Sequence, residues 1–205
     1  MALVKYNNNS ISAVTSTGLA EGSLVPIKTL TASSSATLSF VHGTDGVVLD
    51  STYPIYQFIF VNPSIRSNTE KLGFNVSIDS GSNYNIAKTS TAFRAYHGEN
   101  GSGGVLQYYG DDDLAQGTGL QPIHHGGNSD ADSCISGDMV LYNPSSTVFV
   151  KHFIMKTNNN NSSTNSQVLH IAGYANTTSA INAVRFQSNT GNIDGTIKLY
   201  GIKDS

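Results

Sequence analysis

The residues best suited to chemistry gather between positions 97 and 136. The pair His124-His125 lies a few residues before Asp130 and Asp132, and imidazole and carboxylate groups are common metal ligands. Adjacent side chains on an extended backbone point to opposite sides, so both histidines can bind one ion only in a special turn. We therefore expect a polar loop or a hydrogen bond between subunits at this pair, and no metal.

The acidic run Asp111-Asp112-Asp113 is the second candidate in this segment. Clustered carboxylates can bind calcium, but the D-x-D-x-D-G spacing of a calcium loop and its final Glu are missing. A solvated acidic turn is the expected structure, and calcium binding stays an open alternative. The aromatic pair Tyr108-Tyr109 comes just before the run, and it suits either a sugar-binding platform or aromatic packing under a glycine-rich loop.

These residues are the expected ligand or interface candidates of the chain: Tyr108, Tyr109, Asp111, Asp112, Asp113, His124 and His125. No catalytic residue joins them. The chain has no G-x-S-x-G, P-loop or H-E-x-x-H motif, and Cys134 has no recognisable base beside it. A glycan-degrading enzyme would need a paired acid and base, and Glu21, Glu70 and Glu99 all lie in turn-like sequence. We therefore expect a protein that is not an enzyme and uses no cofactor.

Composition narrows the possible partners. Only 12% of the 205 residues are charged, and the net charge is −3. A protein that binds nucleic acid through phosphates needs a basic surface, so we expect no nucleic acid partner. No stretch approaches the roughly 18 consecutive apolar residues of a membrane helix, and the first ten residues lack a secretory apolar core. The single Cys134 cannot form an internal disulfide.

Hydrophobic periodicity indicates β-strands. Leu72, Phe74, Val76 and Ile78 alternate with small or polar residues, which predicts a strand with one face in the core and one in water. The segment 55–61 is apolar on both faces, which predicts a central strand covered on both sides. Further strands are expected at 37–42, 105–109, 137–142, 147–155, 167–174, 182–187 and 195–202.

Eight to ten short strands separated by turn residues, without any alternation of strands and helices, predict an all-β fold. We expect one domain, an antiparallel sandwich of jelly-roll type. Residues 1–36 are expected to form an extended N-terminal arm or edge strands, and residues 37–205 the sandwich. The glycine-rich segment 97–136 is expected to be a long loop region that serves binding or assembly.

Two C-terminal stretches carry a resemblance to a known class of proteins. Residues 141–153 read LYNPSSTVFVKHF, and residues 191–202 read GNIDGTIKLYGI. Both resemble segments of virion structural proteins of marine tailed phages, including cyanophages. The closing segment is similar to the last core strand of phage fibre, tail and decoration domains. The resemblance extends loosely through residues 56–82.

This resemblance implies a virion component made in the host cytoplasm, all-β and often trimeric, that acts through symmetric interfaces. It leaves open a place on the capsid, the tail or a fibre, and it carries over no catalytic residue. The expected partners are copies of the same chain, with a trimer favoured, and other virion proteins. The alternative is a receptor-binding or carbohydrate-binding fibre tip, in which Tyr108, Tyr109 and the acidic run would contact a host surface glycan.

Overall fold

The computed structural model describes residues 23–65, 67–68, 70–161 and 163–203. The described chain forms twelve strands in two antiparallel sheets and contains no helix. The prediction of an all-β antiparallel sandwich is thus confirmed, with two strands more than the upper limit expected. The part of the chain that the structure describes has no helix that is long and apolar enough to cross a membrane. Residues 1–22, most of the predicted arm, lie outside the described residues.

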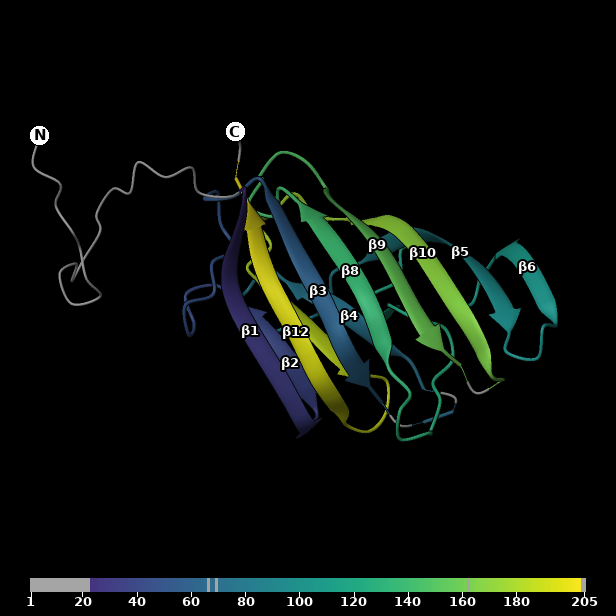
Figure 1. The fold of residues 1–205 in the computed structure, drawn as a ribbon. Coiled ribbons are helices and arrows are strands. Elements are labelled where there is room, and N and C mark those ends of the chain that lie inside the picture. The colour runs from purple at the N-terminus through teal and green to yellow at the C-terminus, as the bar shows by residue number, and fades with distance from the viewer. Residues whose placement is uncertain (1–22, 66, 69, 162, 204–205) are drawn as a thin grey trace, which may run out of the picture.

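One sheet has eight strands and the other has four. The large sheet has the order β1-β12-β3-β8-β9-β10-β5-β6, and the small sheet has the order β2-β11-β4-β7. The strands are β1 (Leu24–Ser35), β2 (Thr37–Val41), β3 (Ile55–Ser64), β4 (Leu72–Ser77), β5 (Lys88–Gly98), β6 (Gly103–Tyr108), β7 (Gln121–Pro122), β8 (Ile135–Tyr142), β9 (Lys151–Asn160), β10 (Asn165–Ala175), β11 (Ala183–Ser188) and β12 (Ile193–Ile202). In Figure 1 the large sheet fans out from β1 at one edge to β6 at the other.

The chain changes sheets repeatedly, as expected for a jelly roll. The segments β2, β3, β4 and β5 alternate between the small and the large sheet, and β11 returns to the small sheet between β2 and β4. A meander of β8, β9 and β10 fills the centre of the large sheet between β3 and β5. Edge strand β1 pairs with β12, and a second edge strand, β6, pairs with β5.

The predicted exposure of β4 is wrong. All six of its residues are buried, including the positions expected to face water. Gly73 lies so close to the start of β7 that a Cβ atom would come within 2.4 Å of the Gln121 carbonyl oxygen. Asn75 Oδ1 accepts a hydrogen bond from Lys88 Nζ at 2.6 Å. The alternation of polar residues in β4 thus reflects a face covered by loops and a buried lysine.

The predicted cover on both sides of β3 is wrong as well. This strand is central, as expected, and one face buries Tyr56, Phe58 and Phe60. Its other face is only partly shielded at Ile59 and exposed at Val61, and no described strand lies over it. Strand β3 therefore carries apolar residues on the outer surface of the sandwich.

Other strand boundaries in the structure differ from those predicted from the sequence. Strand β9 begins at Lys151 and not at 147, and the strand expected at 105–109 is β6 at Gly103–Tyr108. The long strand β5 (Lys88–Gly98) was not predicted. It carries polar residues on its inner face and begins only a few residues after a turn, so its hydrophobic pattern is weak.

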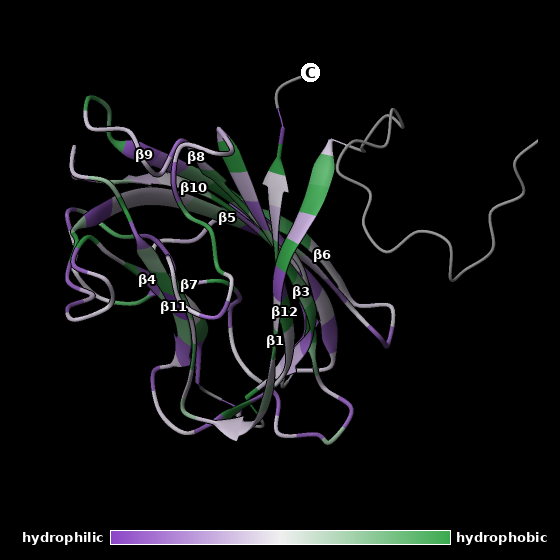
Figure 2. Cartoon of the chain, turned by 90° about the vertical axis from the view of Figure 1, so that its left-hand side faces the viewer, coloured by the Kyte–Doolittle hydropathy of each residue, from purple (hydrophilic) through white to green (hydrophobic). Residues whose placement is uncertain are grey.

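An aromatic cluster fills the space where the two sheets face each other. Phe186 of β11 lies with its ring centroid 5.4 Å from Phe58 and 5.5 Å from Phe60 of β3. Its neighbours within the small sheet are Phe40 and Phe74, at 6.2 and 6.3 Å. Figure 2 shows the large sheet curving beside β4, β7 and β11, with hydrophobic segments on both. Phe186 is thus the side chain that joins the two sheets.

We expect Phe186→Ala to lower the free energy of unfolding by about 3–5 kcal/mol, because it removes a fully buried ring and leaves a cavity. Urea unfolding followed by circular dichroism measures the change. The matched control is Phe149→Ala, whose ring is 68% exposed and whose loss should cost under ~1 kcal/mol. Equal losses for the two variants would show that the sheets do not depend on this cluster.

Candidate functional site

A polar cleft lies where the small sheet leaves the inner face of the large sheet uncovered. It is about 430 Å³ in volume, within the range of ligand pockets. Loops, and not strands of the small sheet, close it over the ends of β5 and β10. Its lining residues are Asn68, Lys71, Arg94, Tyr96, His125, Gly126, Asn161, Ser163, Asn165 and Gln167. We call this feature the polar cleft.

The buried carboxylate of Asp112 supports the cleft from below. Its side chain is 0% exposed, and its oxygens lie 2.6 Å from Lys71 Nζ and 3.0 Å from His125 Nδ1. Lys71 Nζ also donates to the Asp111 carbonyl oxygen at 2.9 Å. Burial opposes ionisation of Asp112, but the close contact with His125 and the hydrogen bond from Lys71 outweigh it and hold the pKa of Asp112 below its usual value. The ionised Asp112 therefore fixes Lys71 and His125 in place.

Arg94 forms the opposite wall of the cleft. Its guanidinium carbon lies 3.7 Å from the centroid of the Tyr109 ring and 5.3 Å from that of Tyr96. The Tyr109 ring in turn meets the edge of the His125 ring at 4.3 Å. Among the described residues, no carboxylate lies within ion-pair distance of Arg94. Arg94 is therefore a cation held by aromatic rings.

The structure brings together three of the predicted candidates, Tyr109, Asp112 and His125, and separates the others. Tyr108 points from the outer face of the large sheet, where its hydroxyl donates to the Asp113 carboxylate. Asp111 is exposed and contributes its backbone carbonyl to Lys71. Within the described residues, no group of three or more His, Cys, Asp or Glu side chains is placed to hold a metal ion. The acidic run is thus divided among three different environments.

His124 does not line the cleft. Its ring is fully buried and its Nε2 accepts a hydrogen bond from the Leu72 amide at 2.9 Å. Burial lowers the pKa of His124 to about 4, so the ring is neutral near pH 7. His124 therefore connects the loop before it to β4 and has a structural role.

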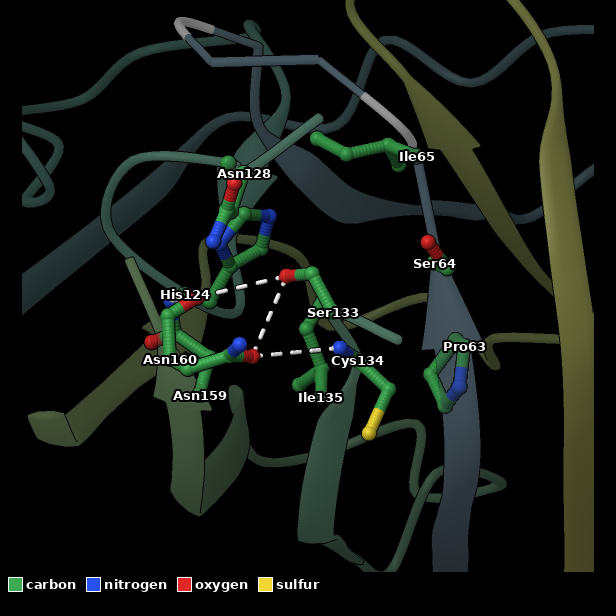
Figure 3. Close-up of a pocket in the computed structure, with 11 residues that line it drawn as sticks. Pro63, Ser64, Ile65, His124, Asn128, Ser133, Cys134, Ile135, Asn159 and Asn160 are labelled. Atoms are coloured by element: carbon green, nitrogen blue, oxygen red, sulfur yellow. Dashed lines mark hydrogen bonds between the residues drawn. The ribbon is translucent and has the colours of Figure 1, made fainter. Parts of the chain in front are cut away.

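A small cavity of about 10 Å³ lies beside His124 (Figure 3). On its floor, Ser133 Oγ donates to Asn160 Oδ1 at 3.1 Å, and the Cys134 amide donates to the same oxygen at 3.3 Å. The Cys134 sulfur points away from these groups in Figure 3. A cavity of this size holds at most a single water molecule, so it is too small for an organic ligand.

Of the residues that line the polar cleft, only His125 is among the candidates predicted from the sequence, and the cations Lys71 and Arg94 were missed. Arg94 and Tyr96 share a face of β5 with the buried Ala92, so they point inward. Polar residues at alternate positions of a strand usually indicate a face in water. Only the unequal number of strands in the two sheets shows that this face lines a cleft.

Comparison of the chain with protein-family models, with curated proteins and with solved structures found no match.

We expect the free energy of unfolding to fall as the pH drops from 6.5 to 4, in part because of His124. The unfolded chain binds the proton at the ordinary pKa of 6.5, whereas folded His124 binds it only at about 4. This difference corresponds to about 3 kcal/mol over that range. In the matched variant His124→Gln, an amide oxygen can accept the Leu72 hydrogen bond without titrating.

Urea unfolding at several pH values between 4 and 7.5 measures both proteins. The other titrating groups are common to both proteins, so the difference between the curves isolates His124. The native protein should lose more stability than His124→Gln on acidification. Parallel curves would contradict the assignment of a buried neutral His124.

Proposed function

We propose that this protein is a structural component of a tailed-phage virion that acts through symmetric contacts between copies and is not an enzyme. The proposal rests on the apolar side chains that are exposed on the outer face of the eight-stranded sheet. The resemblance of residues 141–153 and 191–202 to virion proteins supports the virion as the place of action. A decoration, tail or fibre position is compatible with these contacts.

Apolar side chains are exposed among polar ones on the outer face of several strands of the large sheet. Alternate residues of these strands point outward, opposite the buried core residues. Leu106 of β6 is 72% exposed and Ile154 of β9 is 50% exposed. Other exposed apolar side chains on this face are Val61, Phe93, Tyr108 and Tyr142. Soluble monomers rarely expose apolar patches larger than a few hundred Å², so this face suits a protein partner.

The outer face also carries polar and charged side chains. Asp138 of β8 and Lys156 of β9 are direct cross-strand neighbours, and opposite charges at such positions attract each other. Asp138 also accepts a hydrogen bond from Gln57 at 3.2 Å. Phe93 stacks on His170 with ring centroids 4.9 Å apart. Aromatic and polar side chains thus lie between the exposed apolar residues of the outer face.

The size of the face fits a stable interface. Eight strands spaced about 4.8 Å apart, with about 3.3 Å per residue along each strand, give a face of roughly 1,000 Å². Stable protein interfaces bury about 800 Å² on each partner. Soluble homo-oligomers usually have closed symmetry, and the resemblance favours a trimer among these forms.

We expect the native protein to sediment as a homo-oligomer, with a trimer favoured, and the double variant Leu106→Lys/Ile154→Lys to associate at least tenfold more weakly. Two lysines add like charges to an apolar contact, where they must lose their water. Sedimentation velocity over a range of concentrations measures the association. The matched control is Ile78→Lys, since Ile78 is 38% exposed and follows β4 of the small sheet.

The control should keep the native oligomeric state, and thermal unfolding of all three proteins tests whether they are folded. A native protein that is monomeric at every concentration and never associates with particles would contradict the proposal. Equal weakening by Ile78→Lys and by the double variant would place the contact elsewhere.

A further inference from the structure

The polar cleft has the chemistry of an anion site. Its lining residues include Lys71, Arg94 and His125 but no Asp or Glu. Among the described residues, the carboxylate in contact with Lys71 and His125 is that of Asp112, which is fully buried beneath them. Asp112 pairs with Lys71, whereas Arg94 has no carboxylate within ion-pair distance among the described residues. The cationic groups of the lining therefore face the opening without an acidic side chain beside them in the wall.

Lys71 and Arg94 each keep hydrogen-bond donors that no protein group among the described residues uses. Lys71 Nζ uses two of its three donors on the Asp111 carbonyl and the Asp112 carboxylate. Arg94 Nη1 reaches Gln167 Oε1 at 3.5 Å. With the Gln107 amide oxygen turned toward it, Arg94 also donates from Nε and Nη2, at 3.1 and 3.0 Å. Two of its five guanidinium donors remain, and a planar guanidinium with paired donors matches a carboxylate.

The contacts also hold these groups in position before any ligand arrives. Lys71 and His125 share Asp112, the His125 ring meets the Tyr109 ring, and Tyr109 supports Arg94. Gln167 is buried and donates to the His125 carbonyl oxygen at 3.2 Å. Side chains that are already ordered lose less entropy on binding. The cleft is therefore preorganised.

The rest of the lining is suited to hydroxyl groups. Asn68, Asn165 and Ser163 supply amide and hydroxyl groups along the walls. Tyr96 adds one aromatic ring, and its neighbour Arg94 presents a planar cation. Saccharides have many hydroxyl groups and little apolar surface, so they can form hydrogen bonds with such a lining.

We propose that the polar cleft binds an acidic saccharide whose carboxylate lies against Arg94 and Lys71. This site is separate from the outer face, so it does not depend on the proposed assembly. It also differs from an arrangement in which Tyr108 and the acidic run contact a glycan, because Tyr108 points out of the other side of the sheet.

The test is a titration of the native protein with a trisaccharide of glucuronic acid, followed by NMR of the backbone amides. The control ligand is the trisaccharide of glucose with the same linkage, which lacks only the carboxylates. The acidic trisaccharide should bind at least tenfold more tightly, shift amides around the cleft such as those of Lys71, Gly126 and Gln167, and bind more weakly as salt is added.

Two variants test where the carboxylate of the saccharide lies in the cleft. Arg94→Gln should weaken binding at least tenfold, and the matched control Lys156→Gln, which removes an exposed lysine of the outer face, should leave it unchanged. Asn68→Asp adds a negative charge at the rim and should weaken binding severalfold. Its carboxylate can still accept the Ser129 amide hydrogen bond, so this variant decides the question if Arg94→Gln does not fold.

Three results would overturn the proposal. They are equal affinity for the acidic and neutral trisaccharides, amide shifts confined to the outer face, and no binding of either ligand by the native protein. Loss of oligomerisation with binding intact would count against the proposed function alone, so the two proposals fail separately.

Discussion

The structure depends on one constraint, which is that eight strands pack against four. A sheet buries its apolar face only where another layer covers it. Where β2, β11 and β4 face the centre of the large sheet, aromatic rings fill the gap around Phe186. Beyond the small sheet, the loops that hold Asp112 and His124 supply the cover. The aromatic core and the polar cleft are two consequences of this inequality.

The loops that cover the large sheet bring polar groups into the interior. Each buried polar group needs a hydrogen-bond partner. Asp112 finds Lys71 and His125, and its carbonyl oxygen accepts from Gln121 Nε2 at 2.8 Å. Lys88 is fully buried without a carboxylate partner among the described residues, and burial lowers its pKa to about 8. It donates instead to Asn75 and to the Ile86 carbonyl oxygen. The same loops that close the sandwich therefore hold the charged groups of the cleft in fixed positions.

Sequence reasoning predicted the fold class and most strands because periodicity and turn residues act locally. It correctly placed the strands at 37–42, 55–61 and 195–202 within a few residues of β2, β3 and β12. It failed where the environment of a face is set by distant parts of the chain. Asn75 looked like a residue in water but faces Lys88, and Ile59 looked covered but lies on an outer face.

In the candidate site, too, the residues with a local sequence signal were predicted, and those positioned by distant parts of the chain were not. Tyr109, Asp112 and His125 attract notice as an aromatic, an acid and an imidazole in one glycine-rich segment. Their partners Lys71 and Arg94 come from separate strands or loops, and nothing in their local sequence distinguishes them from surface cations. Only the register of β5 against β10 turns Arg94 inward. A cleft assembled from distant segments cannot be predicted from local patterns.

We propose that the outer face of the eight-stranded sheet is covered by another subunit on a virus particle. Cryo-electron microscopy of intact particles from a virus that encodes this chain would show this contact. We expect regular density for this sandwich on the capsid, tail or fibre, with β5, β6 and β9 facing a neighbouring copy. Absence of the chain from the particles, or an outer face open to solvent in every copy, would contradict it.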